Sequence, residues 1–253
     1  MIECKNCGNH YEGRYCNVCG QKADTPPFTL KTLLRIIISN LFDVDKGVLR
    51  NIKDLTFRPT ATIRDYLDGK RGYYYDWIKY LLLSISIATV LTAYSSAYRE
   101  IYAEASTQTA TGKETQEAIF NTLMEYFNLF YLPMVFIIAL FSYWFFRKYN
   151  YIEHLVINAM IIAQGNIFYV FLFVPILLIE KLGYRFTFFG EVLLGYILFW
   201  MLYTMVIHIK LFEGNLFLRI IKAFFTFVLS YMIYLIVIII AMIILIVVTG
   251  GIQ

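Results

Sequence analysis

The sequence predicts an α-helical membrane protein of about five transmembrane helices, with a small N-terminal zinc ribbon and an amphipathic, interfacial helical collar. Of its 253 residues, 59% are hydrophobic and only 16% are charged, whereas a soluble domain carries about 25% charged residues. All four cysteines lie within the first twenty residues, and long apolar runs follow residue 77. We therefore expect a zinc ribbon at residues 1–22, a linker with juxtamembrane helices at 23–77, and a transmembrane bundle at 78–253.

The cysteines form two C-x-x-C-G knuckles, made by Cys4 with Cys7 and by Cys16 with Cys19. Two such knuckles close together predict a tetrahedral zinc site, and the glycine after each pair permits a tight turn. Four thiolates fill the coordination shell, so we expect a structural site. A redox dithiol is the main alternative, although it usually needs only one C-x-x-C pair. Iron bound by the same four sulfurs is a second alternative.

The ribbon is so small that it has almost no core and is expected to fold on its metal. Tyr11 and Tyr15 are the expected aromatic covers of the site, and His10 is expected to be an exposed loop residue. Cysteines reduced for metal binding also suggest a reducing compartment.

Residues 28–71 are expected to form two or three short helices, at 30–42, at 46–57, and from Pro59 to near Gly69. Thr29 and Asp45 are the expected caps of the first two helices. Each helix is too short to span a bilayer, which needs about 20 apolar residues. Their apolar stripes, flanked by lysine and arginine, are typical of helices that lie in the membrane interface. The alternative is that they pack against the membrane bundle or against one another.

Five basic residues of the collar are candidates for contact with lipid phosphates. They are Arg50, Arg58, Arg64, Lys70 and Arg71. The alternative is that these residues serve as helix caps, as ion pairs between successive turns, and as the positive charges usual beside membranes.

Apolar runs predict transmembrane segments at 78–97, 128–147, 154–179, 190–211 and 217–248. The first follows Lys70, Arg71 and a cluster of tyrosines and Trp77, which is typical of a helix entering a membrane. A polar loop is expected at 98–127, with a short helix at 117–126.

The distribution of lysine and arginine predicts the topology. Residues 1–79 carry 13 Lys and Arg and 9 Asp and Glu, whereas residues 80–253 carry 9 of each. The two loops expected on the same side as the N-terminus hold five further basic residues. We therefore expect a multi-pass protein with a cytoplasmic N-terminus and its C-terminus on the outer side. The mild positive surplus fits anionic lipid better than nucleic acid, so no nucleic-acid partner is expected.

Six polar residues in or beside the expected spans form a possible intramembrane site: Glu153, His154, Asn158, Gln164, Asn166 and His208. The dipole of the helix N-terminus accounts for Glu153. His154 is either a proton carrier or, more commonly, a polar anchor at the interface. The buried amides are expected to bond between helices, and a polar translocation path is the alternative. The absence of a carboxylate or lysine near mid-membrane weakens an ion-coupled transporter.

The sequence contains no recognisable catalytic motif, and its thiols are committed to metal, so no enzyme activity is expected. The leading hypothesis is a scaffold or adaptor whose cytoplasmic ribbon docks a protein partner at the inner face of the membrane. The alternative is a transporter, channel or lipid-handling protein that uses the ribbon for regulation or assembly. An intramembrane enzyme built on Glu153 and His154 is the least supported class. A homo-oligomer remains possible.

An ordered series of motifs resembles a bacterial family of membrane proteins that is catalogued only as a domain of unknown function. The motifs are the two cysteine knuckles ending in Gln21-Lys22, Asp45-Lys46-Gly47, Leu55-x-Phe57-Arg58-Pro59, Ile63-Arg64-Asp65-Tyr66-Leu67-x-Gly69-Lys70-Arg71 and Tyr151-x-Glu153-His154-Leu155-Val156. Thr60 stands where the family pattern has glycine, and Asp76-Trp77 replaces a proline-containing entry to the first span. The resemblance implies the same architecture in a bacterial cytoplasmic membrane. It implies no activity, substrate or catalytic residue.

Overall fold

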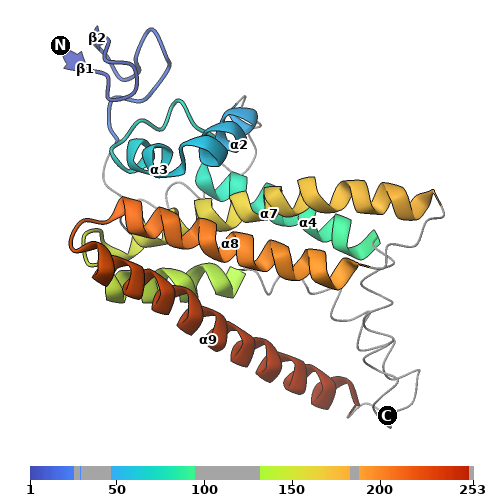
Figure 1. Ribbon diagram of the computed structural model, residues 1–253. Helices are drawn as coiled ribbons and strands as arrows, with labels where there is room; N and C mark the ends of the chain where they lie inside the picture. Colours follow the sequence, from blue (N-terminus) through green and yellow to red (C-terminus); the bar gives the residue numbers. More distant parts are fainter. Residues whose placement is uncertain (26–28, 30–46, 95–131, 183–187, 251–253) are drawn as a thin grey trace.

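The computed structural model describes the chain except for residues 26–28, 30–46, 95–131, 183–187 and 251–253. Figure 1 shows the N-terminal ribbon at one corner, a pair of short helices beside it, and a set of long helices below them. The expected helix at 30–42, the expected cap Asp45, and the expected loop and helix within 98–127 lie outside the described residues.

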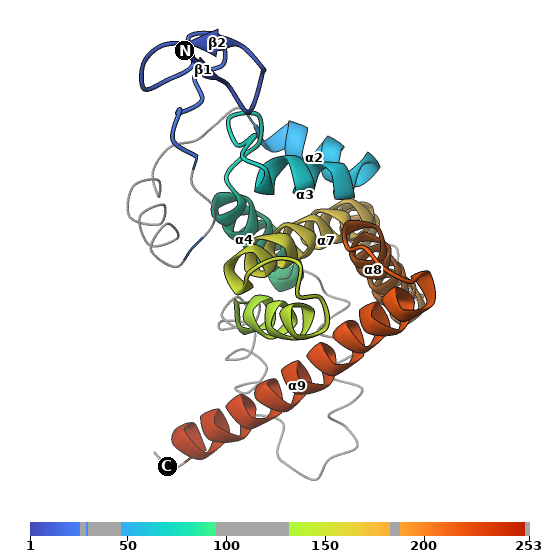
Figure 2. The same ribbon diagram turned by 90° about the vertical axis from the view of Figure 1, so that its left-hand side faces the viewer.

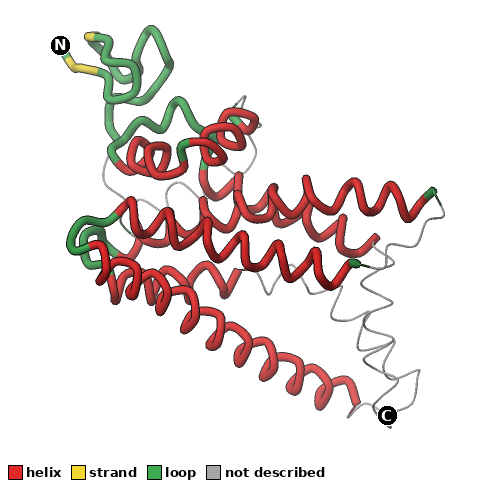
Figure 3. Tube along the Cα trace, in the orientation of Figure 1, coloured by secondary structure: helices red, strands yellow, loops and turns green. Residues whose placement is uncertain are grey.

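The ribbon contains two short antiparallel strands, β1 (Ile2–Glu3) and β2 (His10–Tyr11). Ile2 pairs with Tyr11, and an isolated bridge joins Tyr15 to Lys22. In Figure 3 these are the strands drawn in the described chain, and the rest of the ribbon is loop. Such a unit has little regular structure, so its shape depends on what holds its turns together.

The collar contains α2 (Val48–Phe57) and α3 (Pro59–Leu67). The two helices separate at Arg58, which has φ −140° and ψ 52°, because a residue before proline disfavours the helical conformation. Pro59 then occupies the first turn of α3, as the sequence predicted. The expected helix at 46–57 begins at Val48 instead, and Gly47 provides no side-chain cap. Gly69, with φ +104°, follows the end of α3.

The long helices of the described chain are α4 (Trp77–Tyr94), α7 (Tyr151–Lys181), α8 (Phe189–Leu211) and α9 (Leu216–Gly250). A further apolar helix runs over Leu132–Phe145. Three stretches are long and apolar enough to cross a membrane: Tyr151–Ile179, Gly190–Leu211 and Leu216–Ala241. Trp77–Thr92 and Leu132–Phe145 are apolar but shorter. The chain is therefore a helical membrane protein, and the count of five spans depends on these two shorter helices.

The helix α7 is the centre of the assembly. It packs against α4, α8, α2 and α3, and α3 also packs against α8. Figures 1 and 2 agree in placing α2 and α3 along one flank of the bundle, between the ribbon and the long helices. The helix α9 packs against α8 and then diverges from the bundle toward the C-terminus (Figure 2).

The two halves of α7 differ in exposure. Every residue from His154 to Ile167 is buried, whereas Phe171, Leu172 and Leu178 in the second half are exposed. The first half belongs to the main hydrophobic core, together with Leu55 and Ile63 of the collar. The collar is therefore packed into the membrane bundle rather than tethered beside it.

Candidate functional site

The four cysteines lie on two turns with the same backbone hydrogen bonds. The N–H of Gly8 donates to the carbonyl of Cys4 at 2.8 Å, and the N–H of Gly20 donates to that of Cys16 at 2.8 Å. Gly8 and Gly20 have φ angles of 74° and 72°, a left-handed conformation that favours glycine. The turn therefore requires the glycine that follows each cysteine pair.

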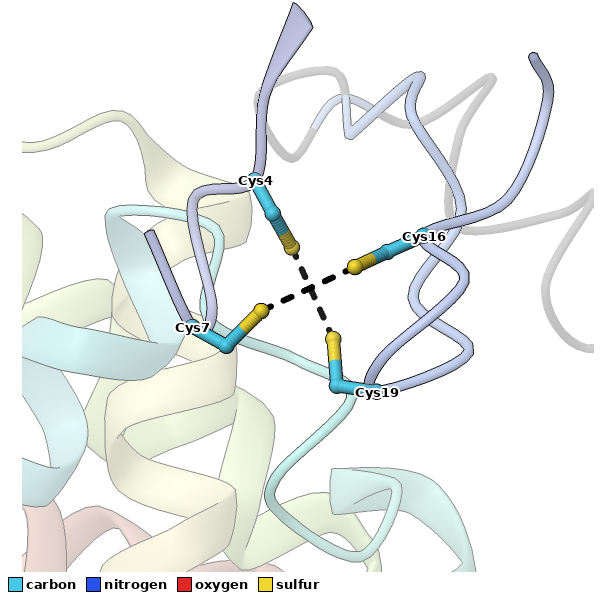
Figure 4. Close-up of side chains that lie close together, drawn as sticks. All are labelled: Cys4, Cys7, Cys16 and Cys19. Carbon is cyan, nitrogen blue, oxygen red and sulfur yellow. Dashed lines mark hydrogen bonds between the residues drawn. The ribbon is translucent and has the colours of Figure 1, made fainter. Parts of the chain in front are cut away.

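The four sulfur atoms point toward one centre (Figure 4). The Sγ atoms of Cys4 and Cys19 lie 3.5 Å apart, those of Cys7 and Cys16 lie 3.6 Å apart, and all four lie within 4.8 Å of one another. A disulfide needs about 2.05 Å, so the thiols are free. Sulfurs placed about 2.3 Å from a metal in a regular tetrahedron are about 3.8 Å apart. The cluster fits these dimensions and can hold a metal ion.

The thiols differ in acidity. The backbone N–H of Cys19 bonds to the sulfur of Cys16 and lowers the pKa of Cys16 to about 6. Cys7 accepts a hydrogen bond from the backbone of Asn9, yet partial desolvation and the neighbouring sulfurs raise the pKa of Cys7 to about 12. Four thiolates this close together repel one another, so the complete ligand set ionises with a cation between its members.

Tyr11 covers the cysteine cluster. Its side chain is buried and packs against Cys4 and Cys16. Tyr15, the second expected cover, is 61% exposed, so that part of the prediction is wrong. His10 is exposed as expected, although it lies on β2 rather than in a loop, and it is not part of the cysteine cluster.

Gln21, directly after the second knuckle, attaches the ribbon to the collar. Its Nε2 donates to the carbonyl of Gly69 at 2.7 Å, and its Oε1 accepts from the N–H of Gly72 at 2.7 Å. A Cβ on Gly69 would lie 3.0 Å from Cδ of Lys5, and a Cβ on Gly72 would lie 3.0 Å from Cβ of Gln21. Both glycines therefore allow the ribbon to approach closely. Sequence reasoning missed this contact.

Asn51 holds the same loop from the α2 side. Its Oδ1 accepts from the N–H of Tyr75 at 3.0 Å, and its Nδ2 donates to the carbonyl of Tyr75 at 3.1 Å. A Cβ on Gly47 would lie 2.7 Å from the backbone nitrogen of Tyr75, which explains the glycine of the Asp-Lys-Gly motif. The side-chain amides of Gln21 and Asn51 thus both hydrogen-bond to the loop that connects α3 to α4. Asn51 could have been found in the sequence as a polar residue on the buried side of α2.

Each of the five basic residues expected at the lipid has an acceptor within the chain. The acceptors are the carbonyl of Tyr73 for Arg50, Asp54 for Arg58, the carbonyls of Lys210 and Leu211 for Arg64, Asp65 for Lys70, and the carbonyl of Tyr66 for Arg71. These contacts agree with the alternative of caps and ion pairs. Lipid contact by the same residues stays a prediction.

Two arginines from other elements cap the C-terminal end of α8. Arg64 donates to the carbonyl of Lys210 at 2.6 Å and to that of Leu211 at 3.3 Å. Arg219, at the start of α9, donates to the carbonyl of Phe212 at 3.0 Å. Both satisfy carbonyls that a helix end leaves unpaired, and both complement its negative dipole.

Glu153 differs from the other predicted intramembrane residues because it is only partly buried, at the first turn of α7. Its carboxylate accepts from the N–H of Asn150 at 2.9 Å, while the N–H of Glu153 donates to Oδ1 of Asn150 at 3.0 Å. This reciprocal pair is a capping box at the start of α7. Glu153 therefore has a structural role at the helix N-terminus, where a negative charge is favoured.

Ser142 joins His154 and His208 inside the bundle. Its Oγ lies 2.7 Å from Nδ1 of His154 and 3.1 Å from Nε2 of His208, and all three side chains are buried. Nδ1 of His208 lies 2.9 Å from the carbonyl of Thr204. Because a carbonyl only accepts, that nitrogen carries the proton, and Nε2 of the neutral ring accepts from Ser142. Ser142 has one proton to give, so Nδ1 of His154 donates to it. The sequence identified both histidines but not the serine between them.

His154 is enclosed rather than exposed as an interfacial anchor. The ring of Phe212 stacks on it, with ring centroids 5.3 Å apart. Asn158, one turn deeper in α7, donates to the carbonyl of His154 at 2.7 Å. This part of α7 is therefore bound to the ends of its neighbours by polar and aromatic contacts together.

Gln164 and Asn166 bond to other helices. The hydroxyl of Tyr80 donates to Oε1 of Gln164 at 2.6 Å, and Nε2 of Gln164 donates to Oγ1 of Thr56 at 2.9 Å. Asn166 donates to Oγ of Ser84 at 3.3 Å. These amides link α7 to α4 and α2, as expected of buried amides in a membrane bundle. Tyr80 and Thr56 were missed because neither residue type is distinctive in a short or apolar helix.

The fold and the cysteine cluster define the class: a helical membrane protein with an N-terminal site that can hold a metal ion. A family model described as "Protein of unknown function (DUF3667)" matches residues 45–89. The matched segment contains α2, α3 and most of α4, and thus the collar and the helix that follows it. No curated protein and no solved structure matches the chain.

Proposed function

We propose that this protein is a scaffold or adaptor of the bacterial cytoplasmic membrane, whose zinc ribbon docks a cytoplasmic protein partner. The observation that carries this proposal is an anchored ribbon with exposed apolar side chains. Gln21 fixes the ribbon to the collar, while Tyr15, just before the second knuckle, and Val18 within it are 61% and 69% exposed. Large apolar side chains held at a fixed place on the surface suit contact with another protein.

Zinc is the metal that we propose for the site. Four thiolates in a tetrahedral arrangement form a closed shell, which supplies structure and leaves no position for a substrate. Iron uses the same ligands, so elemental analysis of the purified protein decides between the two metals. About one zinc per chain in a colourless protein is the expected result, and a coloured, iron-containing protein would overturn this assignment.

We propose five spans with the ribbon in the cytoplasm. Leu132–Phe145 and Trp77–Thr92 contribute to the same hydrophobic core as α7, which supports counting both as spans. Basic residues gather where α7 begins and α8 ends, as the positive-inside rule requires of the cytoplasmic side. Alkaline phosphatase fused after residue 253 should be active and green fluorescent protein dark. A fluorescent, phosphatase-inactive pair would place the C-terminus in the cytoplasm instead.

Docking can be tested by quantitative co-purification from membranes. The double variant Tyr15→Ser/Val18→Ser keeps every cysteine, so it should retain its metal while capture of the partner falls about tenfold or more, as loss of buried apolar anchors predicts. Arg14→Ser, at an exposed neighbouring position, is the matched control and should capture the partner normally. Unchanged capture by the metal-loaded double variant would overturn the docking role.

The transporter alternative receives no specific support from the described residues. The amides expected to line a path bond instead to Tyr80, Thr56, Ser84 and the backbone of His154. These contacts stabilise the bundle, and that use of buried amides is common in membrane proteins.

A further inference from the structure

The helix α2 has two faces of opposite character. Asn51, Asp54 and Leu55 are buried. Leu49 and Phe57 lie four residues to either side of Lys53, which is exposed, and are themselves 80% and 81% exposed. Residues at this spacing share one helix face, so α2 presents an outer stripe of two large apolar side chains with a lysine between them.

The helix cannot rotate to bury this stripe. Asn51 binds both backbone groups of Tyr75. On the bundle side, the hydroxyl of Tyr203 donates to the carbonyl of Leu55 at 2.8 Å, and Gln164 donates to Thr56 at 2.9 Å. The contacts hold α2 on two sides, and the outer stripe therefore faces whatever surrounds the bundle at this level.

The contacts of α2 with Gln164 and Tyr203 show how far along the membrane helices α2 lies. A helix rises 1.5 Å per residue, so Gln164 is about 20 Å from the start of α7 at Tyr151. Tyr203 is about 12 Å from the end of α8 at Leu211. The 31 residues of α7 extend about 46 Å, which exceeds a hydrocarbon core of about 30 Å by roughly 16 Å. Placing that excess on the side where α7 begins puts α2 at the boundary between headgroups and acyl chains.

The charges beside the stripe suit lipid phosphates. Lys53 has no ion-pair or hydrogen-bond partner among the described residues. The guanidinium of Arg50 lies 4.5 Å from the ring centroid of Tyr73 and binds its carbonyl through one nitrogen. Cations beside exposed apolar and aromatic side chains are typical of helices that contact anionic membrane surfaces.

We propose that the outer face of α2 is a lipid-binding surface. Leu49 and Phe57 enter the acyl region of the cytoplasmic leaflet, and Arg50 and Lys53 bind the phosphates of anionic lipids. This assignment narrows the lipid contact expected of the collar from five basic residues to the outer face of α2, because the side chain of Arg64 already binds the carbonyl of Lys210 at the end of α8. It is independent of whatever partner the ribbon binds.

Site-specific photo-crosslinking tests the surface in the full-length protein. A photoreactive phenylalanine is placed at Leu49 or Phe57, and the protein is reconstituted in vesicles of phosphatidylglycerol and phosphatidylcholine in equal amounts. The same probe at Leu198, an exposed residue of α8, reports the yield of lipid adducts in the acyl region. The probe at Val18 of the ribbon reports the aqueous background.

Lipid adducts at 49 and 57, at yields near that at 198 and well above that at 18, are the expected result. Adducts at 198 without lipid adducts at 49 and 57 would overturn the proposal. A crosslink from 49 or 57 to a second copy of the chain or to another protein would also overturn it, because the stripe would then be a protein interface.

The lipid class is tested by removing the two cations. At position 49, the ratio of phosphatidylglycerol to phosphatidylcholine adducts should exceed the ratio of the two lipids in the vesicle by up to about fivefold per cation, from about 1 kcal/mol for each basic residue near the surface. Arg50→Gln/Lys53→Gln should return this ratio to the bulk value. Lys22→Gln, an exposed change on the ribbon, should not alter it. A ratio at the bulk value in the unchanged protein would exclude phosphate recognition by α2.

Discussion

The Nε2 of Gln21 donates to the carbonyl oxygen of Gly69 at 2.7 Å, across 48 positions of the chain, and so joins the cysteine-containing ribbon to the collar. The backbone N–H of Cys16 also donates to the carbonyl of Gln21 at 2.8 Å. The backbone of Gln21 therefore hydrogen-bonds within the second knuckle, while its side chain hydrogen-bonds to the collar. The turn that carries Cys16 and the attachment of the ribbon to the collar are therefore linked through this one residue.

Gln21→Ala should release the ribbon without removing the metal. The change leaves the buried carbonyl of Gly69 without its partner, at a cost of about 1–3 kcal/mol. It also frees the N–H of Gly72, which belongs to an exposed residue. Hydrogen–deuterium exchange should accelerate at residues 69–72, while the metal content stays at that of the parent. Lys22→Ala is the neighbouring control and should leave exchange unchanged. Equal protection of the loop in Gln21→Ala would contradict the proposed attachment.

Loss of a ligand should have the wider effect. Cys16→Ser removes one of four sulfurs, and a ribbon without a core of its own folds only with its metal. We expect loss of bound metal and fast exchange over residues 1–25 and 69–72, with the membrane helices still protected. His10→Ala should keep the full metal content, because His10 is exposed and outside the cluster. A metal-loaded Cys16→Ser protein would show that the four cysteines do not form the site.

The membrane helices could be predicted from the sequence because the hydropathy of a span is summed over about 20 residues, so that a few polar residues do not change the result. Their ends could not be placed in the same way. The helix α7 begins at Tyr151, whereas the span was predicted to begin at 154, because Asn150 and Glu153 form a capping box. These two residues are polar, so a search for apolar residues does not detect them. The break at Pro59 was predictable because proline acts on its immediate neighbour.

The metal ligands were predictable for a related reason: each knuckle is a local turn whose cysteines and glycine are fixed by spacing. The attachment of Gln21 was not, because its two partners are backbone atoms, which carry no signature of residue type. The same holds for Asn51 with Tyr75. Ser142 was overlooked because a serine within an apolar run is common. Its role becomes visible only in the fold, where two histidines lie beside it.

Asp76 gives the stability of the protein a pH dependence. Its Oδ1 accepts from the N–H groups of Ile78 at 3.0 Å and Lys79 at 3.2 Å, so it caps α4. Burial raises the pKa of this carboxyl above its ordinary value. The folded state therefore binds the proton more tightly than the unfolded state. The stability gained in this way is complete below the unfolded pKa of about 3.9 and is lost as the pH rises through the folded pKa.

Asp76→Asn should remove that loss while keeping the capping oxygen. The thermal unfolding midpoint should fall less than that of the parent as the pH is raised from about 4. Asp68→Asn, at an exposed position after α3, should retain the parental slope. Asp76→Ala should be less stable than Asp76→Asn by about 1 kcal/mol, because alanine has no oxygen to cap α4. Parallel profiles for Asp76→Asn and the parent would contradict the assignment.

Ser142→Ala tests the hydrogen-bonded connection between α7 and α8. The change leaves Nδ1 of His154 and Nε2 of His208 buried without their shared partner, at about 1–3 kcal/mol for each stranded nitrogen. The protein should unfold at a clearly lower temperature in detergent. Ser86→Ala, which removes an exposed hydroxyl bonded within its own helix, should have almost no effect.

A double-mutant cycle then separates this connection from simple loss of packing. If Ser142 stabilises the bundle through His154, the loss in Ser142→Ala/His154→Ala should be smaller than the sum of the two single losses, by about 0.5–3 kcal/mol for residues in contact. Additive losses would mean that the histidine contributes through its stack on Phe212 and not through the serine. A coupled result would identify Ser142 as the residue through which the ends of α7 and α8 are held together.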